Sequence, residues 1–80
     1  MSFNDRRALE MLPARIAVLQ TQIAELNAVV ADPDLYARDP GRFGVTTRAL
    51  AVARNELAAA EERWLTLEML REEIDVERKS

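Results

Sequence analysis

The architecture of this chain depends on the connector Ala31-Asp32-Pro33-Asp34-Leu35-Tyr36-Ala37-Arg38-Asp39-Pro40, which separates two long segments of helical periodicity. It carries two Asp-Pro pairs. Aspartate caps a helix by accepting hydrogen bonds from backbone N–H groups, and proline fits the first helical position, where no donor is needed. We therefore expect Asp32-Pro33 to end one helix and open a single turn, and Asp39-Pro40 to open the next long helix. The chain is then a helical hairpin.

The segment before the connector carries an unbroken heptad seam of apolar residues. Their spacings alternate between three and four, which is typical of a helix face packed on a partner helix. The seam consists of Leu9, Leu12, Ile16, Leu19, Ile23, Leu26 and Val30. Pro13 lies just off this seam and lacks the N–H that would bond to the carbonyl four residues back. The proline should therefore kink the helix or restart it at residue 13. We expect a helix over about residues 4–31 with a break near Pro13, a short helix over about 4–11 followed by the main one.

The segment after the connector repeats the pattern with smaller side chains. One seam position holds Phe43, Leu50, Leu57 and Trp64, and the complementary position holds Thr46, Ala53, Ala60, Leu67 and Ile74. Small residues opposite large ones allow two helices to approach closely without voids. We expect a helix over about residues 41–77, with first turns weakened by Gly44 and the β-branched residues after it. The predicted fold class is all-α, an antiparallel two-helix coiled-coil hairpin with a helical turn in the connector, 32–40.

A short connector also determines the register of the two helices. With Val30 opposite Phe43, the antiparallel arrangement places Leu9 near Trp64. We expect Trp64 to cover Leu9, Leu12 and the ring of Pro13. The alternative is a tryptophan that stacks on a base or enters a pocket of a partner.

Under this register the second helix extends beyond the first at the end opposite the connector. Apolar side chains there have few partners within the chain. Such a stripe indicates a dimer contact, a contact with a missing part of a longer chain, or a frayed end. The candidate protein-interaction residues are Leu67, Met69, Leu70 and Ile74.

The composition excludes most catalytic chemistry. The chain contains no Cys and no His, so it lacks thiolate nucleophiles, the commonest general base and the usual zinc sites. Residues 41–44 lack the spacing and the lysine of a phosphate-binding P-loop. We expect no catalytic residue, metal site or cofactor in the chain itself. No signal peptide and no apolar run of about 18–20 residues are visible, so we expect a cytoplasmic protein that does not contact membranes.

Charge is distributed unevenly along the chain. Residues 36–55 carry four arginines and one aspartate, a net charge of +3, whereas residues 56–80 carry four basic and eight acidic residues, a net charge of −4. The planar guanidinium fork suits phosphate oxygens, so the turn end of the hairpin is a candidate nucleic-acid surface. The alternative is a mixed, solvated helix surface. The candidate contacts are Arg38, Arg42, Arg48 and Arg54, with Arg15 as a further contact in a second patch with Arg6 and Arg7.

Tyr36 is expected to pack on the end of the seam, near Val30 and Phe43.

Three motifs in this order resemble a known module. They are Leu12-Pro13, the stretch Asp32-Pro33-Asp34-Leu35-Tyr36, and Arg63-Trp64 followed by Leu67-Glu68. Over about residues 2–70 the chain is similar to the C-terminal domain of bacterial ABC-F-type ATPases of the Uup kind. The resemblance implies an antiparallel two-helix coiled coil that follows two ATP-binding cassettes in a soluble, cytoplasmic ATPase linked to ribosomes, translation and DNA transactions.

The resemblance also carries a functional expectation. It implies a non-catalytic fragment of a longer ATPase, whose cassettes would use ATP and Mg²⁺, with DNA or ribosomal RNA bound by the hairpin turn. The alternative is a structural hairpin that docks a cassette domain, a second copy or a ribosomal protein through the stripe Leu67–Ile74. One departure concerns residues 41–47, where Gly41-Arg42-Phe43-Gly44-Val45-Thr46-Thr47 replaces the Ala-, Leu- and Glu-rich start common in that family. This departure predicts a looser turn.

Overall fold

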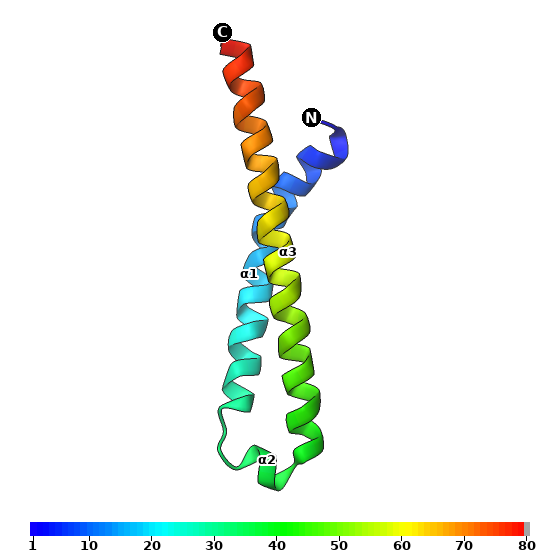
Figure 1. Cartoon of the computed structure of the whole chain (residues 1–80), viewed down its shortest axis with the longest axis vertical. Helices are drawn as coiled ribbons and strands as arrows, with labels where there is room; N and C mark the ends of the chain where they lie inside the picture. Colours follow the sequence, from blue (N-terminus) through cyan, green and yellow to red (C-terminus); the bar gives the residue numbers. More distant parts are fainter. Residues whose placement is uncertain (80) are drawn as a thin grey trace.

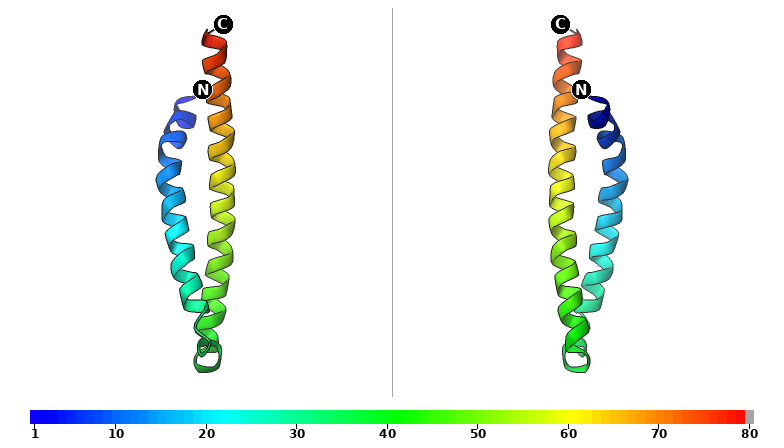
Figure 2. Two further views of the ribbon diagram at one scale, coloured as in Figure 1. Left: turned by 90° about the vertical axis from the view of Figure 1, so that its left-hand side faces the viewer. Right: turned by 90° about the vertical axis from the view of Figure 1, so that its right-hand side faces the viewer.

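The computed structural model describes the backbone of residues 1–79 and the side chains of residues 1–77. Its helices follow the order α1 (Phe3–Val30), α2 (Leu35–Arg38) and α3 (Pro40–Lys79). α1 and α3 lie side by side and antiparallel, with α2 at one end and both termini toward the other (Figure 1, Figure 2). The molecule is a rod of 63 × 18 × 14 Å. The predicted all-α hairpin is confirmed.

The two aspartates of the connector act differently. Asp39 Oδ1 accepts a hydrogen bond from Arg42 N at 3.0 Å, and α3 begins at the proline that follows this cap, as predicted. Asp32 Oδ1 accepts from Asp34 N at 3.0 Å. The carboxylate of Asp32 therefore closes an Asx turn instead of capping a helix. The single turn α2 begins at Leu35, two residues later than the Asp-Pro pattern predicts.

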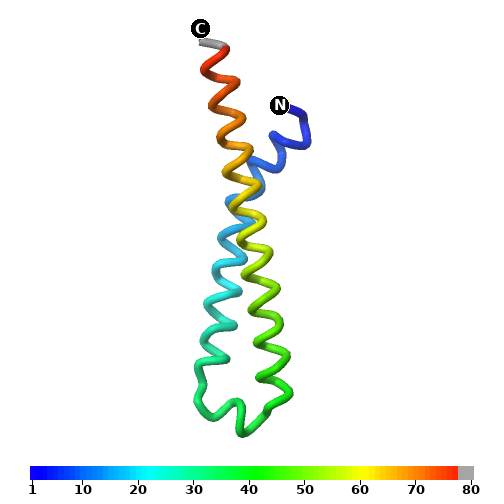
Figure 3. The backbone as a smooth tube through the Cα atoms, in the orientation of Figure 1, coloured from blue at the N-terminus to red at the C-terminus, as the bar shows by residue number. Residues whose placement is uncertain are grey.

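Pro13 bends α1 without interrupting it. The helix runs continuously from Phe3 to Val30 with the proline inside it, so the predicted separate helix over residues 4–11 is wrong. The turns before Pro13 lean away from the axis of the rest of α1 (Figure 3). Proline removes one backbone hydrogen bond and its ring crowds the preceding turn, which a bend accommodates while the bonds on either side remain.

The first turns of α3 are helical despite their weak propensity. The side chain of Thr46 is buried in the seam, and Thr47 Oγ1 donates to Phe43 O at 2.8 Å. Packing on a neighbouring helix routinely outweighs propensity, which differs between residues by less than about 1 kcal/mol. The sequence at the start of α3 therefore forms ordinary helix from Pro40 onward.

The core is a thin seam between the two long helices. Most other seam residues are half-buried, as expected where each helix offers only one apolar stripe. Leu35 of α2 is only 2% exposed and closes the end of the seam. The residue predicted for this position is its neighbour Tyr36, and the sequence pattern does not single out Leu35. The buried apolar residues are Leu9, Leu19, Leu35, Leu50, Ala53 and Leu67.

Leu67 belongs to this core. It is 4% exposed, so the prediction that it lacks partners within the chain is wrong. α1 continues through Pro13 and begins at Phe3, where Ser2 Oγ accepts from Asp5 N at 3.1 Å. Its first turns diverge from α3 (Figure 1).

Candidate functional site

The tip of the hairpin, residues 31–48, places two arginines around one carboxylate. Arg38 Nη2 donates to Asp32 Oδ2 at 2.9 Å, and the Arg38 side chain is 63% exposed. The pKa of Asp32 is held below its ordinary value, chiefly by the hydrogen bond from Asp34 N and next by the Arg38 side chain. The positive charge of Arg42 lowers it further. Arg38 and Arg42 therefore both act on the Asp32 carboxylate at the surface of the tip.

Tyr36 presents an aromatic ring on the same helical turn as Arg38. Its ring centroid lies 5.3 Å from that of Phe43, with an angle of 86° between the planes. This edge-to-face geometry confirms the predicted contact with Phe43. The ring is nevertheless 66% exposed, because Leu35 occupies the interior position. The Tyr36 ring thus contacts Phe43 and is otherwise largely exposed to solvent.

The other candidate arginines lie apart from this cluster. Arg15 Nη2 pairs with Glu56 Oε2 at 2.9 Å, and Arg54 Nη2 donates to Asn27 Oδ1 at 3.1 Å. Both contacts join α1 to α3, so these two side chains help to hold the helices of the hairpin together. Within the described part of the chain, no hydrogen bond or ion pair engages the side chain of Arg48.

Arg42, Arg48 and Arg54 do not share a helix face. Each residue of an α-helix advances about 100° around the axis, so a spacing of six residues rotates the side chain by about 240°. The three arginines therefore point in three directions around α3. The sequence-predicted set of five arginines does not form one surface, and only Arg38 and Arg42 are brought together.

The tip is also balanced in charge. Residues 31–48 carry Arg38, Arg42 and Arg48 against Asp32, Asp34 and Asp39, so the net charge is zero. The predicted basic segment, residues 36–55, keeps its net charge of +3. The tip is neutral because its bounds include Asp32 and Asp34 and leave out Arg54, and Asp32 lies at Arg38.

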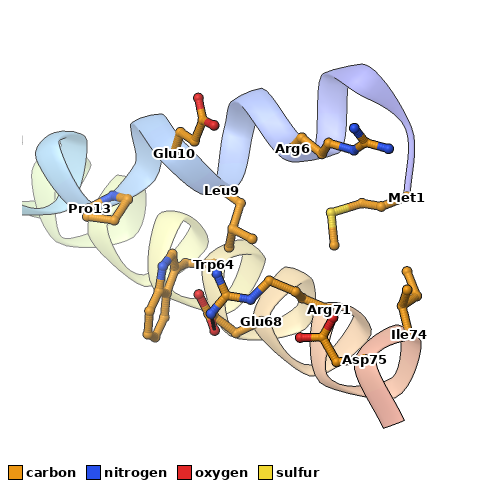
Figure 4. A pocket seen from close by; sticks show the side chains of 10 residues that line it. All are labelled: Met1, Arg6, Leu9, Glu10, Pro13, Trp64, Glu68, Arg71, Ile74 and Asp75. Carbon is orange, nitrogen blue, oxygen red and sulfur yellow. Dashed lines mark hydrogen bonds and ion pairs between the residues drawn. The ribbon is translucent and has the colours of Figure 1, made fainter. Parts of the chain in front are cut away.

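The open end of the hairpin, residues 1–13 and 61–77, contains a hollow of about 690 Å³ between the first turns of α1 and the last turns of α3 (Figure 4). Leu9 and Trp64 approach each other across it, and Pro13 lies beside them, as the predicted register requires. Trp64 is half-buried. Of the predicted interaction stripe, Leu70 and Ile74 are half-buried and Met69 is 56% exposed. The charged lining residues are Arg6, Glu10, Glu68, Arg71 and Asp75.

The described residues show no metal site and no membrane-spanning helix. Among them no group of His, Cys, Asp and Glu is placed to hold a metal ion. None of their helices combines the length and hydropathy needed to cross a membrane. Every buried side-chain nitrogen and oxygen in this part of the chain has a hydrogen-bond partner.

Comparison with known proteins gives one finding. The family described as ABC transporter C-terminal domain matches residues 1–69, which include α1, the whole tip and most of α3. No curated protein and no solved structure matches the chain.

Proposed function

The chain belongs to the ABC transporter C-terminal domain family, and from this premise we propose that it is a non-catalytic accessory domain of an ABC-F-type ATPase that contacts nucleic acid with its tip. The ATP-binding cassettes of such a parent would supply the catalysis. The observation that supports the proposal is the grouping of Arg38, Arg42 and Tyr36 on the surface of the tip. Both termini lie toward the opposite end of the rod, so the tip is the part of the domain farthest from them (Figure 1).

Binding of a phosphate by Arg38 and Arg42 requires little free energy to release their present contacts. An exposed ion pair such as Arg38–Asp32 stabilises a protein by about 0–1 kcal/mol, so a phosphate oxygen readily replaces the carboxylate. Arg42 has no ion pair to break among the described residues. The three aspartates of the tip repel phosphates and keep the affinity low.

Tyr36 adds a contact that does not depend on charge. Stacking of an unpaired base on an aromatic ring contributes about 1–3 kcal/mol and tolerates any sequence. The proposed contacts are guanidinium groups that bind phosphate and a ring that stacks on any base, so we expect little sequence specificity. Together these features favour single-stranded DNA or RNA loops over duplex.

Fluorescence anisotropy of labelled oligonucleotides at two salt concentrations tests the proposal. We expect weak binding, tighter for a single strand than for a duplex, with a slope of log affinity against log salt near −1.8 for the duplex, which corresponds to two phosphate contacts. Arg42→Glu should abolish the salt-sensitive binding. Arg63→Glu, the same charge change at an exposed arginine of the open end that is not among the candidate contacts, is the matched control and should retain most of it. No binding at low salt, or equal loss in both variants, would contradict the proposal.

A further inference from the structure

One side of the hairpin carries a row of residues on each long helix, outside the seam. In both rows the spacing alternates between four and three, which keeps the side chains on one helix face. The ion pair Arg15–Glu56 joins the rows, and members of both line a groove of about 540 Å³ between the helices. We call the two rows the valine face. They are Met11, Arg15, Val18, Gln22, Glu25 and Val29 on α1, and Val45, Ala49, Val52, Glu56, Ala59 and Arg63 on α3.

The valine face gathers the exposed large apolar side chains of the middle of the rod. Within residues 11–29 and 45–63, all of which the structure describes, these side chains are Met11, Val18, Val45 and Val52. Their exposed fractions are 49–64%. All four belong to the valine face, whereas the opposite side, where Arg54 bonds to Asn27, has none in these ranges. Such one-sided exposure indicates an interaction surface.

The charges of the valine face compensate one another. It holds two arginines and two glutamates, so its net charge is zero. Arg15 pairs with Glu56 at 2.9 Å, and Arg63 pairs with Asp5 at 3.4 Å. The face therefore has no strong attraction for a highly charged partner of either sign, and it does not repel a copy of itself.

The face also offers both shapes that a symmetric contact requires. The groove lies between the helices and is lined by apolar side chains, among them Leu26, Val29 and Ala53. Val18 and Val45 lie outside its lining and project from the same side. In a two-fold contact the same patch of each copy meets itself, so projecting side chains of one copy can enter the groove of the other.

We propose that two copies of the chain associate through their valine faces, related by a two-fold axis. The apolar part runs from Met11 to Val29, about 27 Å at 1.5 Å per residue, and the rod is 18 Å wide. Each copy then contributes about 500 Å², and the pair buries about 1,000 Å², the lower limit of a specific interface. We therefore expect a weak, reversible dimer. Its contact excludes the predicted interaction stripe Leu67–Ile74, which lies beyond residue 63.

Opposite charges meet in either orientation of the two copies. Residues 36–55 carry a net charge of +3. In an antiparallel pair they lie beside residues 56–79 of the other copy, whose net charge is −4, and in a parallel pair beside its residues 18–35, whose net charge is −3. The charge distribution along the rod therefore favours a second copy as the occupant, while the contact itself stays neutral.

Sedimentation equilibrium over concentrations up to about 1 mM tests the proposal. The chain has a mass of 9.1 kDa, and we expect the average mass to rise toward twice this value as the concentration increases. Neither the proposal nor this measurement involves nucleic acid, so it stands or falls independently of the function proposed for the tip.

Matched variants locate the contact. Val52→Arg should raise the dissociation constant by about tenfold or more, because each copy then brings an unpaired charge into the apolar contact. Val18→Arg should do the same from α1. Leu65→Arg is the control: Leu65 is 55% exposed, against 56% for Val52, and lies about three helical turns after Arg54, on the opposite side. It should dimerise as the wild type does, and circular dichroism confirms the fold of each variant.

Two outcomes would overturn the proposal. The first is a wild-type chain that remains at 9.1 kDa at every concentration, which would leave the valine face to a different polypeptide. The second is dimerisation that Val52→Arg and Leu65→Arg weaken equally, or that neither weakens, which would place the contact elsewhere on the rod.

Discussion

Asp32 and Arg38 lie six residues apart, and the hydrogen bond from Arg38 Nη2 to Asp32 Oδ2 at 2.9 Å joins the end of α1 to the single turn α2. The other oxygen of the same carboxylate accepts from Asp34 N at 3.0 Å. One aspartate thus organises a connector that has almost no regular structure of its own. It also determines which charges surround the candidate nucleic-acid contact.

Asp32 should therefore titrate below an ordinary carboxyl group, whose pKa is 3.8. Because its pKa is lower in the folded chain than in the unfolded chain, it contributes stability above pH 3.8 that is lost as the pH falls through the folded pKa. Carboxyl ¹³C NMR across acidic pH measures this. Arg38→Met should raise the pKa only partway, since the bond from Asp34 N is the larger cause. An ordinary pKa for Asp32 would contradict the Asx turn.

Leu35 should matter more for stability than its aromatic neighbour. Leu35→Ala removes a side chain that is 2% exposed, and such changes destabilise by about 2–5 kcal/mol. Tyr36→Ala removes an exposed ring with one edge-to-face contact, worth about 0.5–1.5 kcal/mol. Urea unfolding followed by circular dichroism compares the two. A larger loss for Tyr36→Ala would mean that the tyrosine, not the leucine, closes the seam.

The cap of α3 can be tested with a neighbouring control. Asp39→Ala should destabilise the chain by about 1 kcal/mol, whereas Asp39→Asn should retain most of the stability, because the amide oxygen still accepts from Arg42 N. Asp34 precedes α2 but makes no side-chain capping bond. Asp34→Ala should therefore change the free energy of unfolding little, and a loss equal to that of Asp39→Ala would contradict this assignment.

Pro13→Ala should stabilise the hairpin and narrow the hollow. Proline in a helix interior is about 3 kcal/mol less favourable than alanine, and the substitution restores one backbone donor. We expect a higher midpoint of thermal unfolding, with a gain in the free energy of unfolding of at most about 3 kcal/mol. We also expect less acrylamide quenching of Trp64, because a straightened α1 lies closer to α3. A lower midpoint with unchanged quenching would show that the bend does not depend on the proline.

Much of the hairpin is predictable from sequence because its determinants are local. Heptad spacing places Leu9 opposite Trp64, and the Asp39-Pro40 cap starts α3 where the pattern indicates. The continuity of α1 is less predictable, since one proline removes one hydrogen bond and packing on α3 decides between a bend and a break.

The chemistry of the tip depends on contacts that a linear count of charges does not reveal. Asp32 precedes the basic segment in the sequence, yet the turn of the chain brings it to Arg38. A spacing of six residues places Arg42 and Arg48 on different faces of α3, which helical geometry alone predicts. The hollow at the open end is lined by residues on both sides of the bend in α1, and the sequence indicates this bend at Pro13 without specifying its direction.

Amide chemical-shift mapping locates any nucleic-acid contact at residue resolution. A ¹⁵N-labelled sample is titrated with a single-stranded DNA oligonucleotide at low salt, with the Arg42→Glu variant as control. We predict shifts concentrated within residues 31–48, largest near Tyr36, Arg38 and Arg42, and much reduced in the variant. Shifts confined to the open end, or no shifts at all, would contradict the assignment of the tip as the nucleic-acid contact.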